Sequence, residues 1–163
     1  MALDMGRALR LSRVLVTAFT VLAAFPVSAF DLVDSQGRPQ RLADMKGRYV
    51  VLNFWATWCV PCLQEIPEIA AFAKAHPEVA VIGVAMDAED NVDKVKRFAA
   101  KTGHDYTLVF SDAKVEKQLG DPRALPTTRI YDPSGKVVYD KPGRVTQKQL
   151  EELTRRAAQG GKA

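Results

Sequence analysis

The stretch Asn53-Phe54-Trp55-Ala56-Thr57-Trp58-Cys59-Val60-Pro61-Cys62 decides the fold, and it contains both cysteines of the 163-residue chain. A run rich in β-forming residues, 49–55, leads into it, and a helix-forming stretch, 63–75, follows it. A Cys-x-x-Cys pair where a strand passes into a helix is typical of a redox site. The N-terminus of a helix favours a thiolate over a thiol, because it supplies partial positive charge and free backbone N–H groups. The thiolate is the form of cysteine that attacks disulfides.

The composition is that of one globular domain. Of the 163 residues, 47% are hydrophobic and 26% are charged, which is enough for a real core. Two cysteines are too few for a disulfide-stapled scaffold. The net charge is +4, but residues 1–29 hold three arginines against one acid, which leaves 20 basic and 18 acidic residues, a balance of +2, in the remainder. So small a balance gives little reason to expect nucleic-acid binding.

Residues 1–29 have the pattern of a signal peptide. Three arginines precede an apolar run, 14–25, and a small-residue cleavage site that ends at Ala29. We expect cleavage after Ala29. The alternative is an uncleaved membrane anchor through residues 14–29, although this run is shorter than the ~20 residues of a spanning helix. In both cases residues 30–163 are expected to form one exported domain, in the periplasm, where a cysteine pair can cycle.

The rest of the chain alternates strands with helices. Turn residues predict a hairpin over 30–42, and the nearly unbroken apolar runs 49–55 and 79–86 predict strands buried on both faces. An acidic loop, 87–90, follows the second run. Helices are expected over 59–75, 91–101, 114–119 and 147–158. Further strands are expected over 106–110, 127–131 and 136–139. This order predicts an α/β fold with a mixed sheet and helices on both faces.

The helix over 59–75 is expected to turn one apolar face to the core. Four of its residues recur at helical spacing on that face: Leu63, Ile66, Ala70 and Ala73. The two histidines, His76 and His104, are expected at the surface or at helix ends, and neither has a visible catalytic partner.

Cys59 is the candidate nucleophile and Cys62 the candidate resolving cysteine of a redox-active disulfide. At the helix start Cys59 is expected to be exposed and of low pKa, whereas Cys62 lies about one turn further and is more buried. A zinc site would need four ligands, and His76 and His104 lie far apart without finger-like spacing. A static disulfide would close so short a loop that it adds little stability. Redox cycling is therefore the preferred interpretation, and we expect neither a metal nor another cofactor.

The decapeptide resembles the active site of the thioredoxin superfamily. With Glu65, Pro67, the run Leu-Pro-Thr-Thr at 125–128 and the leader, the chain is similar to the TlpA/ResA/DsbE group of extracytoplasmic proteins over about 30–153. The resemblance implies a thioredoxin fold, a central mixed sheet flanked by helices, to which the hairpin is an N-terminal extension. It also implies thiol:disulfide oxidoreductase activity. Members of the group often reduce apocytochrome c cysteines before haem attachment and are re-reduced by a membrane protein.

By position, the resemblance makes Pro126 the cis-proline of the superfamily. The residues alone leave cis and trans open, since most X-Pro bonds are trans. A cis bond would turn the backbone of Leu125 toward the sulfurs, where Leu125, Pro126 and Thr127 can bind a substrate peptide as an added strand. Trp58, which directly precedes the first cysteine, is expected to be an exposed apolar platform for substrate, whereas Trp55 packs in the core.

Asn53 departs from thioredoxin itself, which has at this position a buried aspartate thought to assist proton transfer from the buried cysteine. Glu65 is the expected replacement as general acid and base, because it lies three residues beyond Cys62 on a helix face that continues to Ile69 and Phe72. Partial burial there would raise the pKa of its carboxyl, as such a role requires. The alternative is a solvated acid placed favourably near the helix N-terminus.

These features predict an exported, monomeric thiol:disulfide oxidoreductase that reduces protein disulfides, with apocytochrome c as the leading client in cytochrome c biogenesis and a membrane protein as electron donor. Pro61 favours the reducing direction, because it withholds one backbone donor from the thiolate. The alternatives are a periplasmic oxidant or isomerase, a reductase of copper-site thiols, and, outside catalysis, a copper-handling or chaperone-like binding domain. The absence of a Met or His cluster from the sequence disfavours the last of these.

Overall fold

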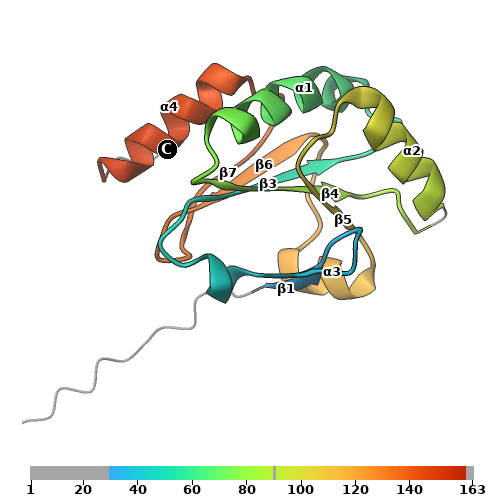
Figure 1. The fold of residues 1–163 in the computed structure, drawn as a ribbon, viewed down its shortest axis with the longest axis horizontal. Coiled ribbons are helices and arrows are strands. Elements are labelled where there is room, and N and C mark those ends of the chain that lie inside the picture. Colours follow the sequence, from blue (N-terminus) through green and yellow to red (C-terminus); the bar gives the residue numbers. More distant parts are fainter. Residues whose placement is uncertain (1–29, 90, 161–163) are drawn as a thin grey trace, which may run out of the picture.

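The computed structural model describes residues 30–89 and 91–160. The expected leader, residues 1–29, lies outside the described part, and so does Asp90 of the acidic loop. None of the described helices is both long enough and apolar enough to span a membrane. Figure 1 shows the described chain as three layers, with a sheet between two layers that contain helices.

A five-stranded sheet forms the middle layer, in the order β5-β4-β3-β6-β7. The central strand, β3 (Val50–Trp55), pairs in parallel with β4 (Ala80–Ala85) and antiparallel with β6 (Thr127–Tyr131). At the edges, β5 (Thr107–Phe110) lies parallel to β4 and β7 (Val137–Pro142) lies antiparallel to β6. All residues of β3 are buried, as its unbroken apolar run predicted. The predicted mixed sheet is therefore confirmed.

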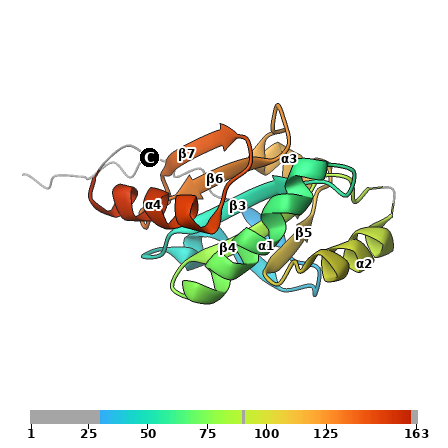
Figure 2. The ribbon, with the colours of Figure 1, turned by 90° about the horizontal axis from the view of Figure 1, so that it is seen from above.

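Three helices cover one face of this sheet: α1 (Val60–Ala75), α2 (Val92–Thr102) and α4 (Gln147–Ala158). Figure 2 looks down on this layer, with α1 in the middle, α4 toward β7 and α2 toward β5. Local sequence sets the ends of these helices. Thr146 and Gln149 form the expected capping box before α4, and Gly103, with φ of 75°, ends α2.

The opposite face is covered by α3 (Ala113–Leu119) and by the expected N-terminal hairpin. The hairpin consists of β1 (Asp31–Val33) and β2 (Pro39–Arg41), and the short 3-10 helix η1 (Leu42–Met45) follows it. Apolar residues of the hairpin and of α3 pack together with the sheet in one cluster, which includes Phe30, Leu32, Leu42, Val115 and Leu119. The thioredoxin-like fold with a hairpin extension is thus confirmed.

Alternate residues of β3 point to opposite faces of the sheet. Val50, Leu52 and Phe54 pack against the hairpin and α3, whereas Val51 packs against α1 and α4. Asn53 shares its face with Val51 and therefore points into the layer of α1. The strand thus places a polar amide in the centre of the sheet, beneath the helix that carries the cysteines.

The buried face of α1 differs from the predicted one. Its fully buried residues are Cys62, Glu65, Ile66, Ile69 and Phe72. Of the four residues expected in the core, only Ile66 is fully buried; the half-buried ones are Leu63, Ala70 and Ala73. The face is rotated because the disulfide and the hydrogen bonds of Glu65 hold a different side of the helix against the sheet.

Candidate active site

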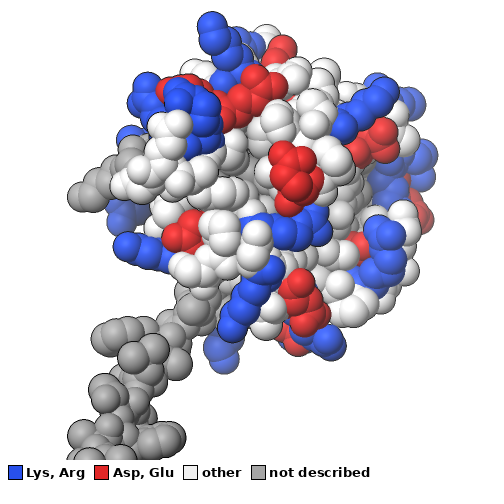
Figure 3. All heavy atoms as spheres, turned by 60° about the vertical axis from the view of Figure 1, so that its left-hand side comes forward, with Lys and Arg blue, Asp and Glu red and all other residues white. Residues whose placement is uncertain are grey.

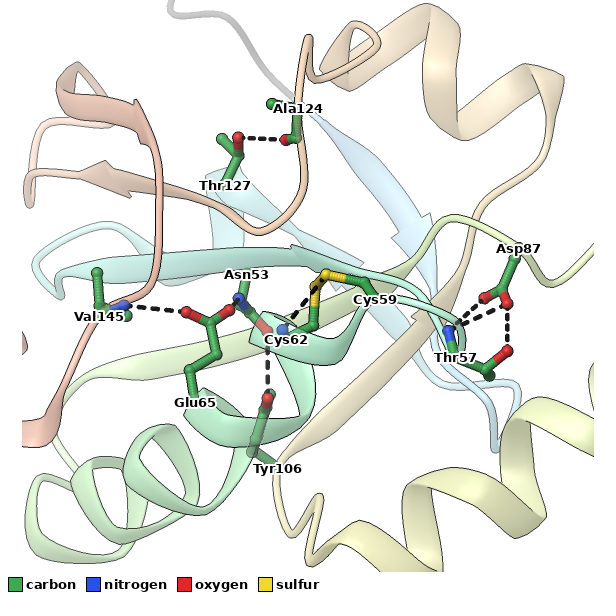
Figure 4. Close-up of a disulfide and its surroundings, with 10 residues drawn as sticks. All are labelled: Asn53, Thr57, Cys59, Cys62, Glu65, Asp87, Tyr106, Ala124, Thr127 and Val145. Atoms are coloured by element: carbon green, nitrogen blue, oxygen red, sulfur yellow. Dashed lines mark hydrogen bonds between the residues drawn. A yellow bond between two sulfur atoms is a disulfide. The ribbon is translucent and has the colours of Figure 1, made fainter.

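Cys59 and Cys62 form a disulfide where β3 passes into α1 (Figure 4). The sulfurs are 2.06 Å apart and the Cα atoms 5.3 Å apart. Cys59 is the N-cap of α1, and its Sγ accepts a hydrogen bond from the backbone N–H of Cys62 at 3.3 Å. The first residues of the helix therefore direct a backbone donor at the sulfur of Cys59.

The cysteine pair is more sheltered than the sequence indicated. Cys62 is fully buried and only 4% of Cys59 is exposed, so the expectation of an exposed Cys59 was wrong, although Cys59 remains the more accessible of the two. The reason is packing. Both cysteines belong to one apolar cluster with Trp55 and Ile66, and Leu125 packs against this cluster.

Exposed apolar side chains flank the pair. Trp58 is 69% exposed and Val60 is 63% exposed, whereas Trp55 is fully buried, as expected for the two tryptophans. Large apolar side chains left in water beside a reactive group are typical of a contact surface for another molecule.

The loop that precedes β6 packs through Leu125 against the apolar cluster that contains both cysteines. Its Leu125–Pro126 peptide bond is cis, which confirms the geometry that the resemblance implied. The hydroxyl of Thr127 donates to the carbonyl of Ala124 at 2.7 Å and closes the loop (Figure 4). The loop thus has a defined shape beside this cluster.

Glu65 is fully buried between α1 and the sheet. Its Oε1 accepts a hydrogen bond from Nδ2 of Asn53 at 2.6 Å, and its Oε2 accepts one from the backbone N–H of Val145 at 3.0 Å (Figure 4). Burial raises the pKa of Glu65 to about 7, because these two hydrogen bonds and the charge of Arg144 offset the loss of solvation only in part. The carboxyl is therefore a buried acid, and the alternative of a solvated one is wrong.

Asn53 joins Glu65 to a pair of stacked rings. Its Oδ1 accepts a hydrogen bond from the hydroxyl of Tyr106 at 3.3 Å, and the ring of Tyr106 stacks on that of His104 with centroids 3.7 Å apart. His104 directly follows the C-cap of α2, a helix-end position as predicted, but its ring nitrogens are buried, and burial lowers its pKa to about 4. The ring fills the space that Gly83 leaves on β4. His76 does lie at a helix end, as the C-cap of α1.

Asp87 is a site residue that sequence reasoning missed, since it was assigned only to an acidic loop. Its carboxylate accepts from the backbone N–H of Thr57 at 3.2 and 3.1 Å and from the hydroxyl of Thr57 at 2.5 Å (Figure 4). Thr57 lies two residues before Cys59. These bonds tie the turn between β3 and α1 to the end of β4. The two residues are 30 positions apart, so no local pattern signals the contact.

One face of the described molecule carries mixed charge. On the face that Figure 3 shows, basic and acidic side chains lie side by side among uncharged ones. Within residues 30–89 and 91–160, no group of three or more His, Cys, Asp or Glu side chains is placed to hold a metal ion.

Comparisons with known proteins agree with this geometry. The profile of the Redoxin family matches residues 18–157. The chain is 36% identical to the thiol-disulfide oxidoreductase ResA of Bacillus anthracis over 124 residues, which cover 75% of this chain and 70% of ResA. Its structure is similar to that of StoA from Bacillus subtilis, with 28% identity over 77% of this chain and 96% of StoA and a TM-score of 0.67. It is also similar to a secreted disulfide oxidoreductase of Mycobacterium tuberculosis that is homologous to E. coli DsbE, with 26% identity over 83% of this chain and 99% of that protein and a TM-score of 0.65.

We predict that Asp87→Ala destabilises the protein. The substitution leaves the hydroxyl and the N–H of Thr57 without their acceptor, which costs about 1–3 kcal/mol in the free energy of unfolding. Urea unfolding of the oxidised protein measures this loss. The matched control is Glu89→Ala, an exposed acid in the same loop, for which we expect a change below about 0.5 kcal/mol. Equal effects of the two substitutions would show that the Thr57 contact contributes nothing.

We predict that Glu65 makes the folded protein less stable as the pH rises. Its pKa is about 7 in the folded chain and has the ordinary value of 4.5 in the unfolded chain, so the folded state binds more protons between these pH values. The free energy of unfolding must therefore decrease as pH rises through this window, by roughly 1.4 kcal/mol per pKa unit, or about 3 kcal/mol in all. Glu65→Gln should remove this decrease. Parallel curves of unfolding free energy against pH for the two proteins would contradict the prediction.

Proposed function

The chain belongs to the Redoxin family and is a ResA/DsbE-like thiol-disulfide oxidoreductase with a thioredoxin fold, and on this basis we propose that it reduces disulfides in exported proteins. The observation that carries the proposal is the disulfide at the N-terminus of α1, with an exposed apolar surface on one side and a buried carboxyl on the other. Protein disulfides are the substrate class that such a surface suits.

In the proposed reaction the dithiol form of the pair is the reductant. The thiolate of Cys59 attacks one sulfur of a substrate disulfide, which forms a mixed disulfide and releases one substrate thiolate. The thiolate of Cys62 then attacks the sulfur of Cys59, releases the second substrate thiolate and forms the bond between Cys59 and Cys62. Two electrons pass to the substrate, whose two thiolates take up two protons.

The assignment of Cys59 as nucleophile follows from access and from hydrogen bonding. Of the two cysteines, only Cys59 has any exposed surface. Its sulfur is also the one that accepts the N–H of Cys62 at the helix N-terminus, and both the N–H and the helix dipole stabilise a thiolate. Cys62 has neither access nor this donor, so it serves as the resolving cysteine.

Glu65 is the proposed proton acceptor for Cys62. A fully buried thiol must lose its proton before it can attack, and bulk water does not reach it. Glu65 lies one turn along the same buried face of α1, and its pKa of about 7 allows it to take up and release a proton near neutral pH.

The substrate surface that we propose has two parts. Trp58 supplies an exposed apolar platform beside the nucleophile. Leu125, Pro126 and Thr127 supply backbone groups in the cis-proline loop, which can pair with an extended substrate segment as an added strand. Such main-chain pairing is tolerant of sequence, as a reductant of several clients requires.

We infer export and the reducing direction from the sequence pattern of the leader and from the helix start. The related disulfide oxidoreductase from Mycobacterium tuberculosis is a secreted protein. Pro61 lies in the first turn of α1 and has no N–H to offer the thiolate, which disfavours a strongly oxidising pair. The client that we propose is an apocytochrome c with its cysteines oxidised, and the electron donor is a membrane protein.

Substituting Cys62 with Ser should trap the substrate. We expect the reduced variant to form a stable mixed disulfide through Cys59 with an oxidised peptide that carries the Cys-x-x-Cys-His haem-attachment motif. Mass spectrometry identifies the cross-linked cysteine. A peptide with the same disulfide but scrambled flanking residues is the control for client preference. Adducts on a Cys59→Ser variant in place of Cys62→Ser would reverse the two roles, and trapping of neither peptide would contradict the function.

The role of Glu65 has a kinetic test. Glu65→Gln removes the titrating carboxyl, so the rate of alkylation of the reduced cysteine pair should change its dependence on pH near neutrality. The matched control is Glu68→Gln, which removes an exposed carboxyl three residues further along α1. This substitution should leave the profile unchanged. An identical profile for Glu65→Gln and the unmodified protein would remove Glu65 from the mechanism.

A further inference from the structure

Tyr106 reaches from the start of β5 across β4 to the central strand. Gly83 of β4 lies directly beside Asn53 of β3 in the parallel register. A Cβ atom on Gly83 would lie 2.9 Å from Cε2 of Tyr106 and 2.3 Å from Nε2 of His104, so any larger residue would collide with both rings. The absent side chain of Gly83 thus leaves a passage over the sheet, and the stacked rings of Tyr106 and His104 occupy it.

This passage brings the hydroxyl of Tyr106 into hydrogen-bonding contact with the residue that holds Glu65. The hydroxyl donates to Oδ1 of Asn53 at 3.3 Å, and Nδ2 of Asn53 donates to Glu65 at 2.6 Å (Figure 4). Burial and the charge of Glu65 raise the pKa of Tyr106 well above its ordinary value, so the hydroxyl keeps its proton. A residue just before β5, one of β3 and one of α1 therefore form one chain of hydrogen bonds, in which Asn53 and Glu65 are fully buried.

We propose that Tyr106 is a positioning residue that acts through the amide of Asn53 to favour the ionised form of Glu65. The proposal rests on the role assigned to Glu65 in the reaction. Nothing in the local sequence of Tyr106 points to it, because its hydroxyl is 53 positions away from the residue that it contacts.

The reason is that the amide of Asn53 has two ends of opposite character. While Tyr106 donates to the amide oxygen, the amide N–H group faces Glu65. An ionised carboxylate can only accept hydrogen bonds, so it needs a donor such as this N–H group. Without the hydroxyl, the amide oxygen would be a buried acceptor with no donor, which is unfavourable. It could recover a donor by turning toward Glu65, but only if Glu65 is protonated. The loss of the hydroxyl therefore strengthens proton binding by Glu65.

The other groups that face Glu65 do not depend on Tyr106. The segment between β7 and α4 supplies the N–H of Val145 and the charge of Arg144. His104 is uncharged above about pH 4, because burial lowers its pKa to that value, so it adds no charge in the neutral range. A substitution of the Tyr106 hydroxyl alone should thus change one contact in this environment.

The test is Tyr106→Phe, which removes the hydroxyl and keeps the ring that stacks on His104. The titration of the Glu65 carboxyl carbon is followed by ¹³C NMR in the oxidised protein. We expect the midpoint to rise by about 0.5–1 pKa unit relative to the unmodified protein, the size of one buried hydrogen bond. The control is Tyr49→Phe, which removes the hydroxyl of a half-buried tyrosine directly before the start of β3. This substitution should leave the midpoint unchanged. An unmoved midpoint in Tyr106→Phe overturns the proposal.

A double variant separates this proposal from the role of Glu65 itself. In a Glu65→Gln background, Tyr106→Phe should cause no further change in the pH dependence of cysteine alkylation, because its effect passes through Glu65. A further change would show that Tyr106 acts by another route and would also overturn the proposal. If the carboxyl midpoint moves in Tyr106→Phe while Glu65→Gln leaves alkylation unchanged, then Tyr106 does position Glu65, and only the proposed function of Glu65 fails.

Discussion

The structure depends on one hydrogen bond between the sheet and the first helix, from Nδ2 of Asn53 to Oε1 of Glu65. Burial of a carboxyl is unfavourable unless hydrogen-bond donors of the protein replace the water that it loses. Asn53 and the backbone N–H of Val145 supply two such donors to Glu65. These bonds hold Glu65 inward and thereby select the face of α1 that meets the sheet. The same face carries Cys62, so the contact that settles the helix orientation also buries this cysteine, the proposed resolving one.

Two carboxylates thus serve the cysteine turn in different ways. Asp87 lies at the end of β4 and holds Thr57, so it fixes the path of the chain into Cys59. Glu65 lies inside the fold, where lost solvation raises its pKa to about 7. Cys59 sits between an apolar surface that can receive a protein and a helix N-terminus that favours its thiolate. The path of the chain into Cys59 and the titrating carboxyl are therefore supplied by separate residues, Asp87 and Glu65. Each of the two can be substituted without the other.

The sequence allowed the strands, the helices and most of the site to be predicted, because these depend on short-range patterns. The apolar run of β3, the capping box at Thr146 and the spacing of Glu65 from Cys62 are all local signals. The contact of Asp87 with Thr57 and the burial of His104 were missed, because each depends on a partner distant in sequence or on a side chain that Gly83 lacks. Helical periodicity also predicted the wrong core face for α1. It considers only apolar residues, whereas the buried face of this helix includes the carboxyl of Glu65.

The central claim is that the carboxyl of Glu65 and the thiol of Cys62 exchange a proton as one coupled pair. The most direct measurement is the ¹³C titration of the Glu65 carboxyl in the disulfide form and in the dithiol form of the same protein. The account predicts a single step near pH 7 in the disulfide form. On reduction, the titration should shift and acquire a second step as the thiol ionises, since interacting groups titrate together. Superimposable titrations in the two forms would contradict the account.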